Sequence, residues 1–500
     1  MRLDPRSDES PVVVVANRLP VDRVPAEDGG GEGEWRQSPG GLVAALEPVV
    51  RSSGGTWVGW PGAPGVELEP FEARGLHVVP VVLSAEEVAD YYEGFANGTL
   101  WPLYHDVTGE PVFERRWWDA YRRVNRRFAD AADAACARGA TVWVQDYQLQ
   151  LVPAMLRQRR PDLRIGFFDH IPFPGWEIYS RLPWRREVVE GLLGADLVGF
   201  QRGADAANFL RAARSTSGVV TRGSVIECAD GRQLRAASFP ISVDAVTLDE
   251  LARRPETRRR AAELRAELGD PETVVLGVDR LDYTKGILQR LRAYGELLDA
   301  GQLAPPATVL VQVASPSRER VEEYQRLRNE VEVTVGRING DHSALGRPAV
   351  HYLHKTFPKE EMAALYLAAD VALVTPLRDG MNLVAKEYVA CRHDERGVLV
   401  LSEFAGAADE LRQAILVNPW DVDGMEEAIL RAVSLRPAEA ARRMRAMRRR
   451  VSEFDVHHWA NAFLGALAMV AEAREANGEE GKDPPGFSPG RALGRPAGGR

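Results

Sequence analysis

A strand-to-helix corner at residues 378–392 carries side chains that suit the binding of an anion beside a hydroxyl group. The segment reads RDGMNLVAKEYVACR and follows DVALVTPL, whose β-branched residues predict a buried strand. A helix start leaves backbone N–H groups unpaired and carries about half a positive charge. Glu387 lies one helical turn beyond Leu383, so its carboxylate shares a face with those groups. A nucleotide presents the matching pair, a diphosphate followed by a ribose.

The simpler interpretation of this corner is an ordinary helix start. Asn382 is then the helix cap, and Gly380 allows the chain to turn tightly. A second corner, GVDRLDYTKG at 277–286, places Arg280 after the predicted strand TVVLGV and Lys285 at the start of the next helix. Alone, such a turn is more often a solvated surface turn. Together the two corners favour a site for one diphosphate.

Other segments place candidate residues just after a predicted strand or just before a helix. These residues are Arg18, Gly40, Gly41, Asp146, His170 and Arg318. Each on its own is more often a cap or turn residue than a catalyst. The aromatic segment YYEGFANGTLWPLYH predicts a turn at its Gly and Asn residues, flanked by Tyr92 and Trp101. Such aromatic density is mostly core, but one face of this segment is also suited to line a sugar site.

Short apolar runs alternate with helix-forming segments and predict the elements that hold these residues. Strands are expected in a first series at 12–15, 78–83, 141–144, 164–168 and 195–200, and in a second series at 273–278, 308–313, 370–375 and 397–401. The alternation predicts an α/β fold with two Rossmann-like, doubly wound domains. Ligands of such domains bind at the carboxyl ends of the strands, so we expect the domains to face a central crevice.

The charged, helix-forming segment from about 244 to 270 separates the two series of strands. We therefore expect an N-terminal domain over 1–245 and a C-terminal domain over 246–476. The last helix of the second domain is a candidate to pack back on the first. Residues 477–500 are rich in Gly, Pro and charge, which predicts a disordered tail.

Composition excludes several classes of function. The chain has 500 residues, of which 45% are hydrophobic, and its net charge of −9 argues against a nucleic-acid partner. Its three cysteines have no zinc-site spacing, the N-terminus lacks the apolar core of a signal peptide, and no apolar run is long enough to span a membrane. We therefore expect a cytoplasmic protein without a membrane partner.

Phosphate-binding motifs of the common kinds are missing from the sequence. It contains no P-loop and no dinucleotide-binding glycine motif, and the pair Asp421 and Asp423 is best interpreted as a helix cap. We therefore expect no metal ion and no cofactor. The charge of a bound diphosphate would be balanced by Arg280, Lys285 and helix N-termini.

Taken together, these segments resemble the trehalose-6-phosphate synthase family of retaining glycosyltransferases, which have the two-Rossmann GT-B fold. The resemblance runs from ANRLPV to about residue 472 and rests on many strings in the same order. They are SPGGLV, WVGW, YYEGFANGTLWPLYH, VNRRFA, WVQDYQL, FFDHIPFP, VDRLDYTKG, PSRERVEEYQ, VGRING, LVTPLRDGMNLVAKEYVA and LSEFAGAADEL. Such a series of ordered matches leaves little room for coincidence.

The resemblance implies a role for each matching residue. In the C-terminal domain and the first glycine loop, the nucleotide sugar would be held by Gly40, Gly41, Arg280, Lys285, Phe357, Asp379, Leu383, Val384, Ala385, Lys386 and Glu387, with Phe357 beside the base. Glucose 6-phosphate, the acceptor bound chiefly by the N-terminal domain, would be held by Arg18, Tyr92, Trp101, Asp146 and Arg318. Residues implied in catalysis are Asp146, His170, Arg280 and Lys285, with His170 near the donor glucose.

The implied reaction moves glucose from a nucleotide sugar to glucose 6-phosphate with retention of configuration. The product would be α,α-trehalose 6-phosphate, on which a separate phosphatase is expected to act. The family default donor is UDP-glucose, but the sequence leaves GDP- and ADP-glucose open. Whether the chain forms a homo-oligomer is equally open.

Departures from the family pattern concern three residues next to the candidate site. Gln145 and Gln148 stand where the family often has histidines, and Asp169 stands where it commonly has an apolar residue. One alternative function is a sister enzyme with a cyclitol acceptor, against which the retained acceptor-binding residues argue. Another is a non-catalytic sugar-phosphate sensor on the same fold, against which the retained catalytic residues argue.

Overall fold

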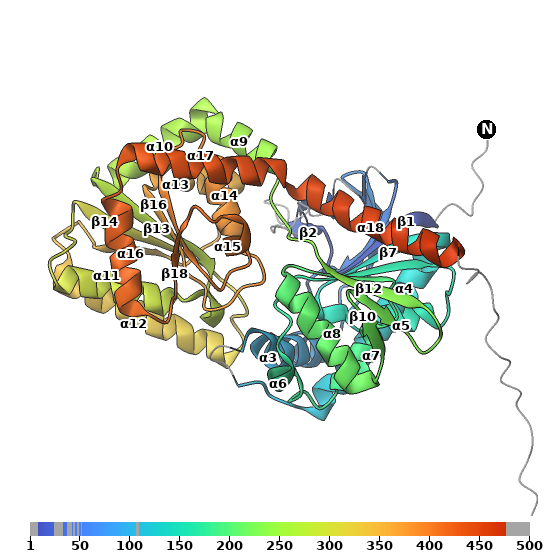
Figure 1. Cartoon of the computed structure of the whole chain (residues 1–500). Helices are drawn as coiled ribbons and strands as arrows, with labels where there is room; N and C mark the ends of the chain where they lie inside the picture. Colours follow the sequence, from blue (N-terminus) through green and yellow to red (C-terminus); the bar gives the residue numbers. More distant parts are fainter. Residues whose placement is uncertain are drawn as a thin grey trace, which may run out of the picture.

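The computed structural model contains two parallel sheets that lie side by side, each with helices around it (Figure 1). It describes residues 9–24, 34–37, 43, 46–47, 50–51, 53–106 and 110–476. Gly40, Gly41 and the predicted tail at 477–500 lie outside the described residues. In the described part of the chain, no helix is both long enough and apolar enough to cross a membrane.

The first sheet has ten strands and belongs to the N-terminal half of the chain. In sheet order they are β10 (Val220–Arg222), β11 (Val225–Glu227), β12 (Gln233–Ser238), β9 (Leu197–Phe200), β8 (Arg164–Asp169), β7 (Cys136–Gln145), β1 (Ser10–Arg18), β4 (Thr56–Trp60), β6 (Leu76–Pro80) and β5 (Phe71–Ala73). The strands from β12 to β6 are parallel, and antiparallel strands close both edges. A small antiparallel pair, β2 (Val21–Val24) and β3 (Glu34–Gln37), follows β1.

The second sheet has six strands, all of them parallel. In sheet order they are β15 (Val350–Leu353), β14 (Thr308–Ser315), β13 (Thr273–Arg280), β16 (Val371–Val374), β17 (Val398–Ser402) and β18 (Ile415–Val417). Its central strands are almost continuous apolar runs, as expected for strands covered on both faces. The prediction of an α/β fold with two doubly wound parallel sheets is confirmed.

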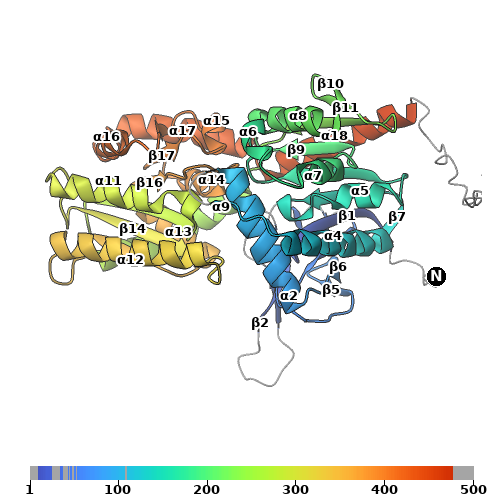
Figure 2. The same cartoon turned by 90° about the horizontal axis from the view of Figure 1, so that it is seen from below.

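Helices surround both sheets (Figure 2). Those of the N-terminal half are α2 (Ala85–Glu87), η1 (Val88–Leu100), α3 (Trp101–His105), α4 (Arg115–Ala135), η2 (Tyr147–Leu149), α5 (Val152–Arg157), α6 (Trp176–Tyr179), α7 (Arg185–Leu192) and α8 (Gly203–Ser217). Those of the C-terminal half are α9 (Ala245–Arg253), α10 (Pro255–Glu267), η3 (Tyr283–Lys285), α11 (Ile287–Asp299), α12 (Glu322–His342), α13 (Lys359–Ala368), α14 (Leu383–Cys391), α15 (Ala407–Glu410), α16 (Val422–Val433), α17 (Pro437–Glu453) and α18 (Val456–Ala476).

The strand order places a switch point in each sheet. In the first sheet the chain winds one way from β1 through β4 to β6 and the other way from β7 through β8 to β9, so the switch lies between β1 and β7. In the second sheet it lies between β13 and β16 for the same reason. Ligands of doubly wound sheets bind beyond the carboxyl ends of the strands at such points. Arg18 ends β1 and Asp146 follows β7, whereas Arg280 ends β13 and Asp379 lies in the loop after β16.

Each strand expected from the sequence overlaps an observed strand, but the turn expected near Asn97 was wrong. Residues 88–100 form the helix η1, of the wide type with i to i+5 hydrogen bonds, which runs directly into α3. Its glycines serve packing rather than turning, because a Cβ at Gly94 would lie 2.6 Å from the Trp117 ring. Asn97 is buried and accepts a hydrogen bond of 2.8 Å from the Tyr147 hydroxyl.

The last helix, α18, crosses from the second sheet to the first (Figure 1) and contacts β8, β9 and β12. Phe463 of this helix stacks on Trp143, with ring centroids 4.6 Å apart. Glycines on two neighbouring strands make room for the Phe463 ring: a Cβ at Gly166 would lie 2.8 Å from it and one at Gly199 2.7 Å. A single hydrophobic cluster therefore continues from the first sheet through α18 to the second.

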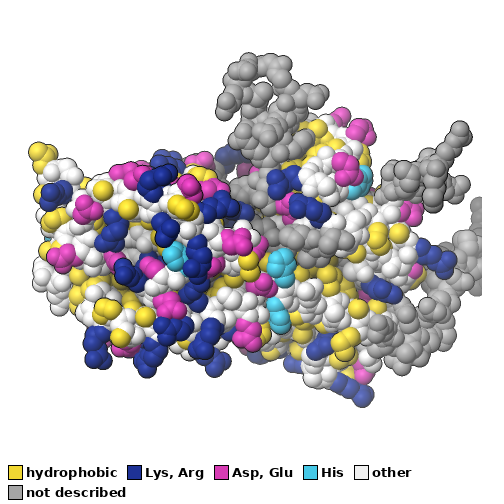
Figure 3. Space-filling model, turned by 90° about the horizontal axis from the view of Figure 1, so that it is seen from above, with side chains coloured by type: hydrophobic (Ala, Val, Ile, Leu, Met, Phe, Trp, Pro, Cys, Tyr) yellow, Lys and Arg dark blue, Asp and Glu magenta, His cyan; other side chains and the backbone are white. Residues whose placement is uncertain are grey.

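The outer surface over the C-terminal half carries both signs of charge. Figure 3 shows basic and acidic side chains interspersed on the upper face. Several are paired, for example Arg260 with Glu267 at 2.6 Å and Arg445 with Glu395 at 2.6 Å. Exposed pairs of this kind contribute little to stability, so the fold depends on its core instead.

We expect that replacing Phe463 by alanine lowers the free energy of unfolding by about 3–5 kcal/mol, because it leaves a cavity between two glycine-bearing strands. Met469→Ala on the same helix is the matched control, since the Met469 side chain is 65% exposed and should cost far less. Urea unfolding curves of the two variants provide the comparison. Equal losses would show that α18 does not hold the first sheet through this ring.

Candidate functional site

Lys285 and Asp379 form the centre of the predicted nucleotide side of the site. Lys285 ends η3 and Asp379 follows β16, and the Lys285 Nζ lies 2.5 Å from the Asp379 Oδ2. Both side chains are largely buried. Burial alone would raise the pKa of Asp379, but the charge and hydrogen bond of Lys285 outweigh it and hold this pKa below its ordinary value. The amide of Asn382 adds a hydrogen bond of 3.2 Å to the same oxygen.

The helix start at α14 has the form that the sequence predicts. The Asn382 side chain accepts a hydrogen bond of 3.1 Å from the Ala385 N–H and so caps the helix. Leu383 and Val384, in the first turn, are only half-buried. Gly380 is required by a close approach: a Cβ there would lie 2.3 Å from the carbonyl oxygen of His170. The corner therefore touches the main chain of the first domain.

Glu387 and Lys386 point to different surroundings. The Glu387 carboxylate accepts a hydrogen bond of 2.7 Å from the Tyr366 hydroxyl, and burial raises its pKa. The Lys386 Nζ instead donates 2.7 Å bonds to the carbonyl oxygen of Ile241 and to Glu410, and its side chain is fully buried. Neighbouring residues of a helix point about 100° apart, so these two side chains meet different partners. The role of Lys386 in holding the nucleotide sugar stays a prediction.

Phe357 lies in the loop between β15 and α13 and is half-buried. The Lys355 ammonium lies 4.6 Å from the centre of its ring. This arrangement is compatible with an aromatic wall for a nucleotide base, so its place beside the base stays a prediction.

Arg318 is the link between the second domain and the acceptor residues of the first. It follows β14, with a positive φ of 48° that non-glycine residues rarely adopt. Its guanidinium bonds to Asp282 at 3.3 Å and to the Tyr324 hydroxyl within the second domain. It also bonds across the domain boundary to the Tyr147 hydroxyl at 3.2 Å. The carboxylate that Arg318 pairs with is therefore Asp282, which follows β13, and not one of the helix α12 that comes after Arg318.

The Trp101 ring brings the two predicted groups of residues together. The Arg318 guanidinium carbon lies 4.0 Å from the ring centre and that of Arg280 lies 5.4 Å from it. Both distances allow cation–π attraction. Arg280 ends β13 and belongs to the predicted diphosphate side, whereas Arg318 belongs to the predicted acceptor side. The two sides thus meet over one aromatic ring, as a transfer between two bound substrates requires.

Arg18 and Tyr92 extend this group along the first domain. Arg18, the last residue of β1, lies 5.2 Å from the Trp60 ring and pairs with Asp22 at 2.8 Å. The Trp60 ring lies 5.8 Å from the Tyr92 ring. The Arg18 side chain is 44% exposed, so its guanidinium remains accessible to an anion. Its position at the end of a switch-point strand agrees with the prediction.

Asp146 stands directly after β7 with a strained positive φ of 74°. Its Oδ1 accepts N–H bonds from Tyr147 at 3.0 Å and from His170 at 3.2 Å. Burial raises the pKa of Asp146 to about 6, although these bonds and two nearby arginines oppose the shift. The carboxylate is therefore mainly ionised at pH 7 and can accept a hydrogen bond from a hydroxyl group.

His170 follows β8 and is held between two glutamine side chains. Its Nε2 lies 2.9 Å from the Gln145 Oε1, and its Nδ1 lies 3.3 Å from the Gln201 Nε2. Burial lowers the pKa of His170 to about 3, so the ring is neutral at physiological pH. Asp169 is fully buried beside it and burial raises its pKa well above the ordinary value. Gln148 is also buried, and its main-chain carbonyl oxygen accepts a hydrogen bond from the Asn125 side chain.

Three residues that the sequence did not single out, Asp282, Tyr147 and Tyr324, form hydrogen bonds with the predicted site residues. Asp282 accepts bonds from Arg318 and from the Tyr324 hydroxyl, and Tyr147 bonds to Arg318 from the other domain. All three lie inside the strings that carry the family resemblance. The strings therefore contain these residues, but a carboxylate and two hydroxyl groups whose partners are distant in the chain are not marked as site residues by their neighbours.

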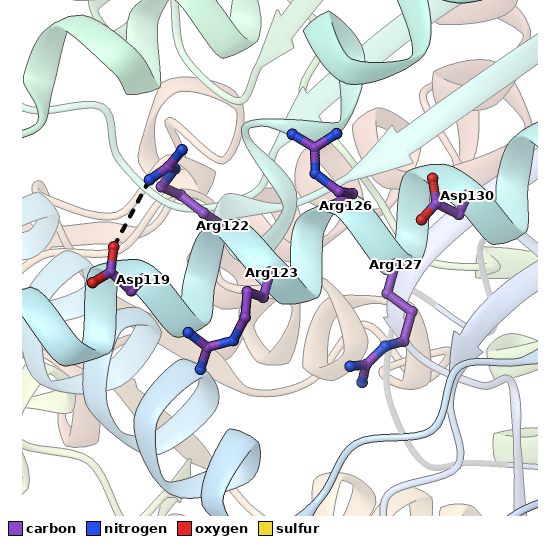
Figure 4. A pocket seen from close by; sticks show the side chains of 6 residues that line it. All are labelled: Asp119, Arg122, Arg123, Arg126, Arg127 and Asp130. Atoms are coloured by element: carbon purple, nitrogen blue, oxygen red, sulfur yellow. Dashed lines mark ion pairs between the residues drawn. The ribbon is translucent and has the colours of Figure 1, made fainter.

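A surface groove on α4 is separate from this site. Figure 4 shows the six side chains that line it: Asp119, Arg122, Arg123, Arg126, Arg127 and Asp130. All of them belong to α4, and Arg122 pairs with Asp119 at 3.8 Å. None of them is among the predicted site residues. In the described ranges, no three His, Cys, Asp or Glu side chains are grouped so that they could hold a metal ion.

A model of glycosyltransferase family 20 matches residues 10–469. The chain belongs to glycosyltransferase family 20. It is 56% identical over 490 residues to the trehalose-6-phosphate synthase of Mycolicibacterium gilvum (strain PYR-GCK), which covers 95% of this chain and 96% of the relative. It is therefore a glycosyltransferase, as the strings in its sequence implied.

Two solved family 20 structures resemble this one closely. The α,α-trehalose-phosphate synthase of Burkholderia xenovorans in complex with glucose 6-phosphate is 36% identical, with a TM-score of 0.83 over 91% of this chain and 99% of that chain. The Escherichia coli protein bound with UDP-2-fluoro glucose is 35% identical, with a TM-score of 0.83 over 91% and 98% of the two chains. The two-domain GT-B fold is thus shared with enzymes whose structures contain a sugar nucleotide or a sugar phosphate.

We expect that Lys285→Met lowers stability at pH 7 by about 3–5 kcal/mol, because it leaves the buried Asp379 carboxylate without its ammonium. In the wild-type protein the lowered pKa of Asp379 stabilises the fold above its unfolded value near 3.9, and this stability is lost as the pH falls through the folded pKa. In the variant, burial raises that pKa, so the penalty should be largest at neutral pH and shrink on acidification.

Melting temperatures between about pH 5 and pH 8 measure this difference. Lys359→Met, at an exposed lysine of the same domain, is the control and should show neither the loss nor its pH dependence. A loss for Lys285→Met that stays constant over the pH range would mean that Asp379 does not depend on Lys285.

Proposed function

We propose that this family 20 enzyme transfers glucose from UDP-glucose to glucose 6-phosphate, giving α,α-trehalose 6-phosphate and UDP. The observation that carries the proposal is the Trp101 ring, which lies against both Arg280 and Arg318. It joins a set of residues suited to a diphosphate to a set suited to a sugar phosphate. Solved relatives that contain UDP-2-fluoro glucose or glucose 6-phosphate support the same pairing.

The donor side provides charge for a leaving diphosphate. Arg280, Lys285 and the N-terminus of α14 place positive charge at the ends of β13 and β16. The Glu387 carboxylate, one turn into α14, accepts hydrogen bonds from the ribose hydroxyl groups. The first main-chain N–H groups of α14 contact the phosphates, and Phe357 lies beside the base. A role of Gly40 and Gly41 in holding the nucleotide sugar stays a prediction.

The acceptor side recognises a sugar phosphate. Arg18 and Arg318 approach from different domains and bind the phosphate, for which the planar guanidinium provides paired donors. Tyr92 and Trp101 line the sugar, and ionised Asp146 accepts a bond from one of its hydroxyl groups. Binding the phosphate at both domains draws them together and excludes water, which would otherwise compete as an acceptor.

The transfer joins the anomeric oxygen of glucose 6-phosphate to C1 of the donor glucose. The bond between C1 and the diphosphate oxygen breaks, its electron pair stays on the diphosphate, and the acceptor proton moves to that oxygen. Arg280 and Lys285 stabilise the developing negative charge. Attack on the face from which the diphosphate leaves retains the configuration. His170 is a neutral imidazole at neutral pH, because burial lowers its pKa to about 3, so it does not act as a general acid. Its role is to orient the donor glucose.

Two other assignments compete with this function. A cyclitol-phosphate acceptor would use the same arginines but a different sugar wall, and a sensor would bind both ligands without turnover. The product of the proposed reaction is a phosphate ester, so a separate phosphatase is needed to release the free disaccharide. A homo-oligomeric state remains a prediction for solution measurements.

Purified enzyme should form trehalose 6-phosphate from glucose 6-phosphate fastest with UDP-glucose, because a solved relative with the same fold is a UDP-forming synthase. Initial rates with UDP-, GDP- and ADP-glucose, measured as nucleoside diphosphate release and by chromatography of the product, decide the donor. Binding without turnover would support the sensor instead, and a product formed only with a cyclitol phosphate would support the sister enzyme.

We expect that Arg318→Ala raises the KM for glucose 6-phosphate roughly tenfold to a hundredfold, since a charge-assisted pair is worth about 1.5–3 kcal/mol. The KM for the nucleotide sugar should change much less. The preference for glucose 6-phosphate over glucose should narrow, because the variant loses a group that distinguishes them. Steady-state kinetics with both acceptors measure these effects.

The matched control is Arg326→Ala, on α12, where the arginine is exposed and pairs only with Glu322 of the same helix. It should leave both KM values unchanged. Arg318→Ala would contradict the assignment if it lowered the melting temperature but kept its acceptor preference, because Arg318 would then serve only to hold Asp282 and Tyr324.

A further inference from the structure

The side chains around His170 form a hydrogen-bonded chain whose direction is fixed at one end. The Ile241 N–H donates a bond of 2.9 Å to the Gln201 Oε1. The Gln201 amide must therefore present its Nε2, a donor, to the His170 Nδ1. The His170 Nδ1 then has to accept, so the ring proton lies on Nε2 and is donated to the Gln145 Oε1. Each bond in this chain determines the next.

This chain runs across the carboxyl edge of the first sheet through neighbouring strands. Gln145 is the last residue of β7, His170 follows β8, and Gln201 follows β9. Ile241 follows β12, the next strand in sheet order. Strand register fixes their spacing, since Gln145 pairs with Phe168 in β8 and Asp169 pairs with Phe200 in β9. The arrangement therefore depends on the sheet and not on a mobile loop.

The same chain is attached to the second domain through Lys386. Ile241 lies in the segment between β12 and α9, where the chain leaves the first sheet. Its carbonyl oxygen accepts a bond of 2.7 Å from the Lys386 Nζ, which is also paired with Glu410 at 2.7 Å. Lys386 belongs to α14, the helix that begins at the predicted diphosphate site. The linker residue Ile241 is thus bonded on one side to Gln201 and on the other to α14.

We propose that Gln201 is a positioning residue for glucosyl transfer: bound to the Ile241 N–H, it holds His170 as the neutral, Nε2-protonated imidazole facing the donor glucose. The proposal deepens the function argued above and rests on it for the identity of the donor. Gln201 is buried and touches neither substrate by this assignment, so it acts through His170. Gln145, where relatives often carry histidine, completes the clamp with an acceptor that does not titrate near neutral pH.

Protonation of His170 meets two obstacles here. An imidazolium would turn its Nδ1–H towards the Gln201 amide N–H groups, and that amide cannot rotate without losing the Ile241 N–H. The ring is also enclosed by Phe168 and by Trp459 of α18, with ring centres 4.6 and 6.0 Å away. The acidic groups nearby are Asp146, which accepts the His170 main-chain N–H, and Asp169, whose pKa burial raises well above its ordinary value. Neither is bonded to the His170 ring.

Nitrogen-15 NMR of histidine-labelled enzyme tests the proposal without any turnover. The His170 signals, assigned by their loss in His170→Asn, should show an unprotonated Nδ1 and a protonated Nε2 from about pH 5 to pH 8. In Gln201→Glu the new carboxylate still accepts the Ile241 N–H and offers a second acceptor to Nδ1. The ring should then become an imidazolium that titrates within this range.

Kinetics should change in the same variants in a pattern that a merely structural role would not produce. Gln201→Leu keeps the volume but frees the ring, so kcat should fall about tenfold to a hundredfold through misplacement of the donor. The KM for glucose 6-phosphate should stay within about twofold, because its phosphate is bound elsewhere. Gln201→Glu should also lower kcat and add the ionisation of His170 to the pH profile, which the wild-type profile does not contain.

Gln150→Leu is the matched control, since Gln150 is a fully buried amide in the same domain that bonds to Tyr104 and to the Tyr147 carbonyl. It should cost similar stability and leave the His170 spectrum unchanged. A wild-type spectrum with protonated Nδ1, or an unchanged His170 titration in Gln201→Glu, would overturn the proposal. If the wild-type spectrum is as expected but no trehalose 6-phosphate forms, the proposed function fails while the clamp on His170 stands.

Discussion

Asp282, a carboxylate with no exposed surface, provides the counter-charge on which the site depends. One of its oxygens accepts bonds from the Thr284 N–H and hydroxyl, and the other accepts bonds from Arg318 and Tyr324. Burial alone would raise the pKa of Asp282, but Arg318, Arg280 and Lys285 together hold it below its ordinary value. Without this carboxylate, several cations would repel each other in a largely dehydrated region.

The same charge balance explains how the cations of the site can stay in place when no phosphate group is bound. Two anionic ligands bring negative charge that must be neutralised at once, and preformed cations do so without reorganisation. Without the ligands, Asp282 pairs with Arg318, and Asp379 pairs with Lys285. The guanidinium groups of Arg280 and Arg318 also lie against the Trp101 ring, whose face attracts them. The site is therefore charged and ordered before any substrate binds.

Domain contacts place these groups opposite each other. The Arg318 guanidinium reaches Tyr147 of the first domain, and Gly380 lies against the main chain of His170. Away from the site, Arg202, the residue before α8, forms two hydrogen bonds with Asp409 of α15. The helix α18 packs on the first sheet, and Ile241 in the linker bonds to residues of both domains. A domain boundary near residue 245 remains a prediction about folding units, but the linker between them is itself part of the hydrogen-bonded structure.

The sequence by itself determined the elements and the corners that carry the chemistry. Apolar runs such as VVVV and TVLVQV predict buried strands, because their side chains are more stable away from water. The helix caps at Asn382 and Asp421 form because a short polar side chain accepts a hydrogen bond from a nearby main-chain N–H. These are interactions within a few residues, which local sequence can predict. The family strings added the expected grouping of Trp101 with Arg318, and the structure places the Arg318 guanidinium against the Trp101 ring.

Only the tertiary structure decided which partner each side chain meets. Lys386 and Glu387 are neighbours in the sequence, yet one bonds to a linker carbonyl 145 residues away and the other to a tyrosine of α13. The bonds of Asp282 to Arg318 and of Gln201 to His170 could not be predicted from local sequence, because these partners are distant in the chain. The Asn-Gly pair in η1 predicts a turn, but the structure has a helix there. Packing of the helix glycines against Trp117 outweighs the preference of Asn and Gly for turns. Contacts between distant segments are set by sheet order and register, which no short stretch of sequence contains.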